Sequence, residues 1–473
     1  MATKLKEVLG GDSGFPHEVT DPERIPTPRY YDPEFYQREV EKLWPHVWQM
    51  ACRLEQIPNV GDWIEYSNLG HSVMIVHTKD GSIKAYHNAC RHRGVPLTEG
   101  GSSGNCKRKG FICPFHGWQW DMEGNNRFVY GKHMFSERQL DQDDLKLPQA
   151  RVELWGGFVF VNFDDDAPGL HEQIGDMLDN MGARNVDTMR AEWWYSTELP
   201  ANWKIAMEAF MEGYHVLRTH PQLHEAVPTL YNSRYGNDTG GLEAEPYNPN
   251  IPLRQNITAQ IKNFRLLSEG MAGMVHGKEV DIIQGLENAE LPEDDPQQAL
   301  NMWFGIVMAE ITRQLGERGE NVPNLIEVSQ THPVQAVEFL FPNMFMLPTF
   351  TSMSVYRIRP TGPETCRFEI WSLTQFPKGE ENDPVMEPRE LPYDSTEFPP
   401  IPQQDYSNIP LQQQGCHAEG FDFMRLSNTM EGLISNYNRI IDGYLRGTDL
   451  DKLATATREL GGNFDGPIKE LDV

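Results

Sequence analysis

The 473-residue sequence has no long hydrophobic run. A helix needs about 20 apolar residues to cross a bilayer, and the strongest candidate, residues 340–350, is short and contains proline. The first residues, MATKLKEVLGGDSG, lack the apolar core of a secretory signal. We therefore expect a cytoplasmic protein that has no membrane partner.

Basic residues and cysteines are also scarce. The chain has 41 Lys and Arg against 69 Asp and Glu, which gives a net charge of −28. Because the acidic residues are spread along the whole chain, we expect no basic surface for nucleic acid phosphates. Six cysteines are too few for a disulfide framework in a chain of this length. Cysteines that stand beside histidines therefore indicate metal binding.

The first third of the chain divides into two parts. Residues 1–48 are an N-terminal arm and a helix, for which Asp32 and Pro33 supply the start and Pro45 the end. In residues 49–165, short β runs alternate with the turn clusters KDG, EGG and MEGNN. This alternation predicts a small antiparallel β domain.

Residues 166–473 mix helical and strand patterns. The segments 354–360 and 367–376 alternate like paired strands and are separated by a Gly-Pro turn. Residues 232–325 are typical of a long insertion with helical pieces, the clearest at 298–317. We expect an α+β domain here, with the N-terminal helix packed on it.

The densest group of metal-binding residue types lies in NACRHRGVPL and CPFHGWQW. It has the form Cys90-x-His92 and Cys113-x2-His116. Two such pairs bind one tetrahedral zinc ion, or an iron–sulfur cluster with two Cys on one iron and two His on the other. The spacing allows both. Each pair falls in a loop between β runs, where apolar cover would limit water, and this favours the cluster.

A second group lies in MEAFMEGYHVLRTHP. Glu208, Glu212 and His215 stand at i, i+4 and i+7, which predicts that they share one helical face. His220 follows just before a proline, where the helix should end. Two histidines and one carboxylate form the facial triad that binds Fe(II) and leaves positions for O2. The candidates for the carboxylate ligand include Glu212 and the distant Asp422.

These motifs resemble a known family. NACRHRG and CPFHGWQWD are similar to the Rieske [2Fe–2S] motif of the ring-hydroxylating, non-haem iron oxygenases, and NWK…E…E-x2-H-x4-H is similar to their mononuclear iron segment. The resemblance implies that Cys90 and Cys113 bind one iron of the cluster and that His92 and His116 bind the other. It also implies a mononuclear Fe(II).

For that iron, the resemblance implies His215 and His220 as ligands. The third family ligand is an Asp that opens a helical stretch far downstream, and QQDYSNIPLQQQG nominates Asp405. Glu212 and Asp422 stay as alternatives.

In the family, the acidic residue at position 212 bridges the two metal sites. Glu212 would accept hydrogen bonds from His116 of a neighbouring subunit and from His215. Many members have Asp there, and several have Asn where this chain has Ala209. The substrate class therefore does not carry over from the better-known members.

The resemblance implies a Rieske domain set into a helix-grip catalytic domain, and a head-to-tail homotrimer or hexamer in which each cluster serves the next subunit's iron. The expected function is a terminal oxygenase that hydroxylates, dihydroxylates or demethylates an apolar or aromatic small molecule, as in aromatic compound catabolism. The alternatives are a Rieske electron carrier without oxygenase activity and a structural zinc protein.

Electrons should come from another protein. The chain contains no G-x-G-x-x-G unit and no P-loop for a nucleotide or flavin. We therefore expect a separate reductase or ferredoxin as partner. A candidate landing patch lies next to the cluster motifs and consists of Arg91, Arg93, Lys107, Arg108 and Lys109.

Overall fold

The computed structural model describes residues 14–235, 246–271, 273–292 and 294–473. The chain forms two compact units, and each is described by itself. The larger unit combines Met1–Glu39 with His171–Val473, and the smaller unit is Val40–Leu170. The predicted β domain, 49–165, falls inside the smaller unit.

The smaller unit is built from antiparallel β-sheet, which confirms the predicted architecture of this part. Its main sheet has seven strands in the order β2-β11-β10-β5-β4-β3-β6. These are β2 (Gln49–Arg53), β3 (Asp62–Asn68), β4 (His71–His77), β5 (Ile83–His87), β6 (Ser103–Asn105), β10 (Gln149–Trp155) and β11 (Phe158–Asn162). A second sheet contains β7 (Phe111–Ile112), β8 (Gln119–Trp120) and β9 (Asn126–Phe128), and a short helix α3 (Gln142–Leu145) follows.

Strand β4 shows why this sheet is buried on both faces. Successive side chains of a strand point to opposite faces, so Val73 and Ile75 belong to one apolar core. Met74 and Val76 belong to the other, which also contains Cys90. The second core therefore supports the loops that carry the predicted cluster ligands.

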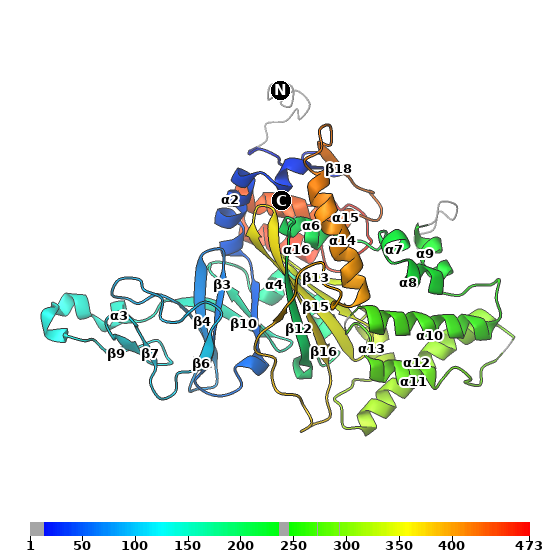
Figure 1. Ribbon diagram of the computed structural model, residues 1–473, viewed down its shortest axis with the longest axis horizontal. Helices are drawn as coiled ribbons and strands as arrows, with labels where there is room; N and C mark the ends of the chain where they lie inside the picture. Colours follow the sequence, from blue (N-terminus) through cyan, green and yellow to red (C-terminus); the bar gives the residue numbers. More distant parts are fainter. Residues whose placement is uncertain (1–13, 236–245, 272, 293) are drawn as a thin grey trace. The chain divides into compact units, whose positions relative to one another are not determined.

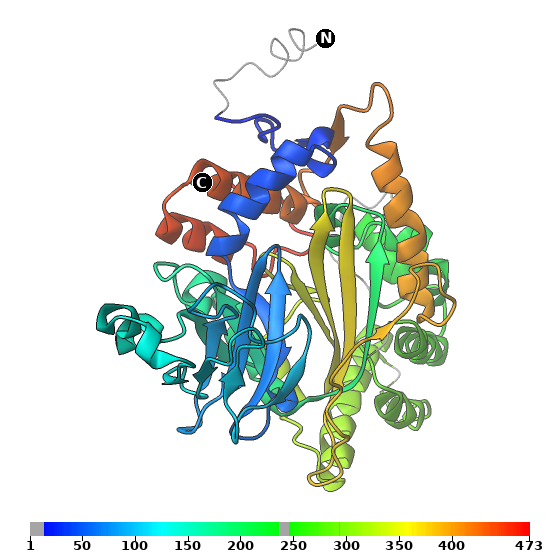
Figure 2. The same cartoon turned by 60° about the vertical axis from the view of Figure 1, so that its left-hand side comes forward.

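The larger unit contains a six-stranded sheet in the order β13-β14-β15-β16-β12-β17. Its pairs are antiparallel except β12 with β17. The predicted strand pair is confirmed as β15 and β16, which run beside β12 in Figure 2. The strands are β12 (Arg190–Leu199), β13 (Glu338–Leu340), β14 (Met344–Pro348), β15 (Ser352–Gly362), β16 (Thr365–Thr374) and β17 (Arg389–Glu390).

Helices α10 (Leu253–Gly270), α11 (Gly277–Gln284) and α12 (Pro296–Glu317) pack on one another (Figure 1). Their shared core contains the fully buried Trp303. Helix α12 confirms the helix predicted at 298–317. Residues 236–245, 272 and 293 of the predicted insertion lie outside the described residues.

The other helices of the larger unit complete the α+β fold expected from the sequence. Tyr437 of α15 is fully buried and packs edge-on against Trp203 and Phe339. The helices are α2 (Pro33–Lys42), α4 (Leu170–Ile174), α5 (Met177–Gly182), α6 (Trp203–Glu208), α7 (Val216–Thr219), α8 (Pro221–Ala226), α9 (Pro228–Tyr235), α13 (Leu325–Thr331), α14 (Pro400–Gly415), α15 (Gly432–Arg446) and α16 (Leu450–Arg458). In the described ranges, none is long and apolar enough to cross a membrane.

The N-terminal segment is fastened to the larger unit by buried polar contacts. Glu39, at the end of the segment, pairs with Lys204 Nζ at 2.7 Å and accepts a hydrogen bond from Trp203 Nε1 at 3.1 Å. Strand β1 (Arg24–Pro26) pairs with β18 (Phe423–Arg425). Arg29 forms a fully buried ion pair with Asp442 of α15 at 2.6 Å. The arm is therefore part of this unit from its first described residues.

Candidate metal centres

The loop after β5 presents Cys90 and His92. The Cys90 backbone N–H donates to Val95 O at 2.8 Å, and the Gly94 N–H donates to Cys90 O at 2.8 Å. Gly94 has φ +77°, a left-handed conformation that glycine adopts without steric cost. These two bonds turn the chain tightly around the cysteine.

The loop between β7 and β8 repeats this arrangement. The Cys113 N–H donates to Trp118 O at 2.8 Å, and the Gly117 N–H donates to Cys113 O at 3.0 Å. Gly117 has φ +70°. Two similar turns thus present one Cys and one His each.

The four side chains meet as two pairs. The sulfurs of Cys90 and Cys113 contact each other, and burial raises the pKa of the Cys90 thiol. The Nδ1 atoms of His92 and His116 lie 3.2 Å apart. Three ligands of a single zinc ion would place their donor atoms within 4.8 Å of one another, and among the described residues these four contain no such trio. The two cysteines lie together and the two histidines lie together. This pairing fits a two-iron cluster, in which one iron binds the cysteines and the other binds the histidines, better than it fits a single zinc ion.

Aromatic side chains cover this site only in part. Trp118 stacks on the His92 ring with 4.7 Å between centroids. Phe115, next to His116, is 58% exposed, and the guanidinium of Arg93 lies 4.6 Å from its ring centroid. The histidine side of the site is therefore near the surface of the smaller unit.

The second candidate centre is the group His215, His220 and Asp405. The two histidines flank the short helix α7, and Asp405 lies in α14. The Asp405 Oδ1 atom lies 3.1 Å from His220 Nε2 and 3.9 Å from His215 Nε2. One donor atom from each residue falls within 4.8 Å of the other two. Two imidazoles and one carboxylate in this arrangement suit Fe(II).

The structure brings neither rival carboxylate into this set. Glu212 accepts a hydrogen bond from the Nδ1 atom of His215 at 3.0 Å, on the side of the ring that faces away from Asp405. Asp422 is exposed in the segment before β18. The geometry therefore favours Asp405 as the third ligand.

The prediction that Glu208, Glu212 and His215 share one helical face is wrong. Helix α6 ends at Glu208, and α7 begins only after His215. The Glu212 carboxylate accepts the backbone N–H of His215 at 2.9 Å, and the Gly213 N–H donates to Asp465 Oδ1 at 2.6 Å. These bonds replace the helical ones, so the chain turns between the two helices.

Glu208 is a structural residue of the core. It accepts hydrogen bonds from the Tyr30 hydroxyl at 2.9 Å and from Asn438 Nδ2 at 2.8 Å. Complete burial raises the pKa of Glu208 to about 7.

Two residues that the sequence analysis missed hold the ligand segment. Gln404 Oε1 accepts a hydrogen bond from His220 Nδ1 at 2.7 Å, which directs Nε2 of that ring toward Asp405. Gln404 directly precedes Asp405 in the sequence, so its position next to a candidate ligand could have identified it as a residue of the site. Asp465 lies 252 residues from Gly213 along the chain, and no local pattern connects them.

The carboxylates set the electrostatics of the second centre. Burial alone would lower the pKa of His215, but the hydrogen bond and charge of Glu212, together with the charge of Asp405, raise it to about 9. A positive charge is thus stabilised at this ring. The same field favours a bound metal cation.

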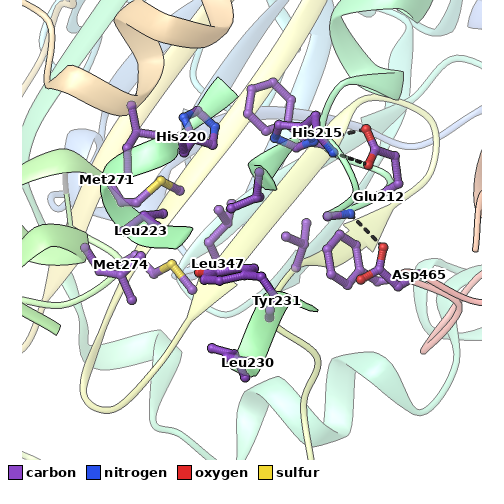
Figure 3. A pocket seen from close by; sticks show the side chains of 18 of the residues that line it. Glu212, His215, His220, Leu223, Leu230, Tyr231, Met271, Met274, Leu347 and Asp465 are labelled. Atoms are coloured by element: carbon purple, nitrogen blue, oxygen red, sulfur yellow. Dashed lines mark hydrogen bonds and ion pairs between the residues drawn. The ribbon is translucent and has the colours of Figure 1, made fainter. Parts of the chain in front are cut away.

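A cavity of about 340 Å³ adjoins His215, His220 and Asp405. Figure 3 shows the two histidines at one end, with methionine and leucine side chains around the remaining space. Among the described residues other than Ser233 and Arg234, whose side chains are outside the described part, no Lys or Arg lines it. The apolar and aromatic lining residues are Phe210, Val216, Leu223, Leu230, Tyr231, Tyr235, Leu267, Met271, Met274, Ala336, Val337, Leu347, Ile401 and Phe464.

Both units match known protein families. Residues 47–131 match the family described as Rieske [2Fe-2S] domain. Residues 186–447, more than half of the chain, match the family described as Ring hydroxylating alpha subunit (catalytic domain).

The chain is also similar to characterised proteins and solved structures. It is 26% identical to the carnitine monooxygenase oxygenase subunit of Escherichia coli, over 59% of this chain and 79% of that protein. It is 29% identical to the biphenyl dioxygenase subunit alpha of Paraburkholderia xenovorans, over 73% of this chain and 70% of that protein. A naphthalene 1,2-dioxygenase variant bound to phenanthrene shares the fold, with TM-score 0.61 and 19% identity over 92% of this chain and 96% of that chain.

These relatives are terminal oxygenases, which need O2 and electrons from a partner reductase or ferredoxin. The chain therefore belongs to the ring-hydroxylating alpha-subunit family of Rieske oxygenases, and it is an oxygenase component that uses a Rieske [2Fe–2S] cluster and a mononuclear iron to oxidise a small molecule.

Proposed function

We propose that this oxygenase acts on an uncharged, mainly apolar molecule that binds in the cavity beside His215 and His220. The observation that carries the proposal is the lining of this cavity. It offers no cationic side chain among the residues whose side chains the structure describes, a set that leaves out Arg234, and its carboxylates are engaged. Glu212 accepts a hydrogen bond from His215, and Asp465 accepts one from the Gly213 N–H. Asp405 faces the two histidines.

This lining favours apolar substrates for a simple reason. Burying an apolar surface stabilises a complex by about 25 cal/mol per Å², whereas burying an unpaired carboxylate is costly. An aromatic acid would need Arg or Lys as a partner here. The relatives named for biphenyl and naphthalene oxidation support an arene-like substrate and a role in aromatic compound catabolism.

A second candidate is the demethylation of a quaternary ammonium compound. Tyr231 and Tyr235 line the cavity together with carboxylates, and both kinds of group attract a cation. A relative named for carnitine oxidation supports it. Carnitine itself also carries a carboxylate, for which the described lining provides no cationic partner.

We further propose Cys90, His92, Cys113 and His116 as the cluster ligands, and His215, His220 and Asp405 as the ligands of the mononuclear iron. Bound there, the cluster would supply electrons and the mononuclear iron would supply the position at which O2 is activated. Glu212 and Gln404 hold the Nδ1 protons of His215 and His220, respectively, and thereby keep the Nε2 lone pairs free for the metal. The apolar walls exclude water from the bound substrate.

We propose a head-to-tail ring of identical subunits, a trimer or a hexamer, in which the cluster of one copy serves the iron of the next. Each unit carries an exposed aromatic residue beside its own centre. These are Phe115, 58% exposed beside His116, and Tyr214, 53% exposed beside His215. Exposed aromatic side chains are favoured in protein contacts, and a heterologous contact closes into a ring.

Mixed oligomers test this assembly. A Cys113→Ser variant lacks a cluster and an Asp405→Ala variant lacks the mononuclear iron, so each should be inactive alone. After both are co-expressed, activity should return in the mixed ring. A monomeric protein, or no recovery, would exclude the proposed route. The reductase or ferredoxin would dock on the exposed basic residues Arg91, Arg93, Lys107, Arg108 and Lys109.

The substrate proposal is tested by O2 uptake with a generic reductase and labelled O2. Naphthalene represents uncharged arenes, benzoate represents aromatic acids and carnitine represents quaternary ammonium compounds. We expect labelled product and coupled O2 uptake with naphthalene, and neither with benzoate. Coupled turnover with carnitine alone would support the second candidate.

A further inference from the structure

Helix α9 contributes a tyrosine hydroxyl to the wall of the cavity. Tyr231 of α9 lines the cavity, and Figure 3 shows its ring away from His215 and His220, which stand at the other end. The hydroxyl oxygen of the ring points toward Met274 and Leu347. Tyr231 therefore places one polar atom among apolar side chains of the cavity.

The Tyr231 hydroxyl is unpaired but accessible. Among the described residues, its oxygen has no hydrogen-bond partner. The oxygen keeps accessible surface, because it is not one of the sealed polar atoms of the described chain that lack a partner. A ligand in the cavity can therefore reach this hydroxyl and form a hydrogen bond with it.

The Tyr231 ring is held in place from outside the cavity. The ring of His224, in α8, packs edge-on against it with 6.3 Å between centroids and 82° between planes. His224 Nε2 lies at hydrogen-bond distance, 2.9 Å, from Asn232 Oδ1. A side chain that is fixed before the ligand binds loses little freedom on binding. The hydroxyl is therefore oriented in advance.

The cavity contains a second tyrosine hydroxyl, but that one is engaged. Tyr235 donates to Asp465, which also accepts the Gly213 N–H at 2.6 Å. Tyr235 thus belongs to the framework that holds the ligand segment, whereas the Tyr231 hydroxyl remains available to a substrate. Burial raises the pKa of Tyr231 to about 12, so at pH 7 this hydroxyl is neutral and able to donate.

We propose that Tyr231 determines substrate specificity by donating a hydrogen bond to an acceptor oxygen of the substrate. The substrate class is then an uncharged apolar molecule that carries one carbonyl or ether oxygen. Because Tyr231 lies away from His215 and His220, this bond turns the opposite end of the substrate toward the proposed iron ligands. The inference rests on the proposed function. It adds the acceptor group, the residue that selects for it and the end that is oxidised.

The experiment compares acetophenone with α-methylstyrene, which has nearly the same shape but carries CH2 in place of the carbonyl oxygen. Dissociation constants are measured by equilibrium dialysis in sealed cells with the iron-loaded holoenzyme. Tyr231→Phe should weaken acetophenone binding by about tenfold, the effect of one hydrogen bond, and should leave α-methylstyrene binding unchanged. Phenylalanine keeps the ring, so the change in the ratio of the two constants isolates the hydroxyl.

Tyr393→Phe is the matched control, because Tyr393 is a partly buried tyrosine outside the cavity lining. This variant should keep the wild-type ratio. Tyr231→Phe should keep its iron content and melting temperature, because the hydroxyl makes no hydrogen bond within the described structure. With a reductase, the wild type should oxidise acetophenone on the ring, remote from the carbonyl, and Tyr231→Phe should give a mixture of products.

No binding of acetophenone to the wild type, an unchanged ratio in Tyr231→Phe, or an equal loss of affinity for both ligands would overturn the inference. In each of these cases, coupled O2 uptake with naphthalene would leave the proposed function standing. Turnover with charged substrates alone would overturn the proposed function and, with it, the assigned substrate class.

Discussion

Glu212 accepts two hydrogen bonds from His215, one from its backbone N–H at 2.9 Å and one from its ring Nδ1 at 3.0 Å. The first bond replaces a helical bond and turns the chain between α6 and α7. The second fixes the ring so that Nε2 faces Asp405 (Figure 3 shows the pair). One carboxylate thus shapes the backbone and orients a proposed iron ligand.

Glu212→Ala should keep both metal centres in the presence of excess Fe(II), but it should lower turnover by about 10–100-fold, the usual cost of losing a group that orients a ligand. Glu212→Gln should recover part of the activity, since its amide oxygen still accepts one bond. Iron analysis and the rate of electron transfer from the reduced cluster provide the measurements. Complete loss of mononuclear iron from Glu212→Ala would identify Glu212 as a ligand.

Asp405→Asn should remove the mononuclear iron and abolish product formation, because a neutral amide cannot replace the carboxylate of the triad. The visible absorption of the cluster should persist. Asp422→Asn is the matched control, since Asp422 is exposed and lies outside the set, and it should keep full iron content and activity. Equal iron in both variants would refute the proposed ligand set.

Gln404→Leu should weaken Fe(II) binding by about 10–100-fold, because His220 loses the acceptor of its Nδ1 proton. A chelator competition assay measures this affinity. Gln414→Leu makes the same chemical change at an exposed position of α14 and should have no effect. A Gln404 variant with wild-type affinity would show that α14 positions Asp405 without acting on His220.

The raised pKa of Glu208 predicts that the free energy of unfolding depends on pH. Burial raises the pKa of Glu208 from 4.5 to about 7, so the folded protein holds this proton more tightly than the unfolded chain does. The resulting stabilisation is complete below pH 4.5 and is lost as the pH rises through 7, a change of about 3 kcal/mol.

Glu208→Gln should remove this dependence. Between pH 5 and pH 8, the free energy of unfolding of the wild type should therefore fall relative to that of the variant. Urea unfolding at several pH values measures the difference, and Glu419→Gln at an exposed position should track the wild type. Parallel curves for Glu208→Gln and the wild type would show that Glu208 ionises normally.

Local patterns predicted much of this protein. The alternation in 354–360 and 367–376 predicted β15 and β16, and the helical pattern at 298–317 predicted α12, because strands and amphipathic helices have distinct periods. The helical spacing of Glu208, Glu212 and His215 predicted a continuous helix that does not form. Backbone N–H groups in this segment donate to the carboxylates of Glu212 and Asp465 and not to backbone carbonyls one helical turn earlier.

The sequence alone indicated two metal centres, because the residue types and short spacings of Cys90, His92, Cys113 and His116, and of His215 and His220, are local properties of the chain. The family resemblance nominated Asp405 but left Glu212 and Asp422 open, and only the tertiary structure decided which carboxylate meets the histidines. Asp405 reaches the site through the packing of α14. Such contacts depend on the fold of the whole unit, because they join residues that are far apart along the chain.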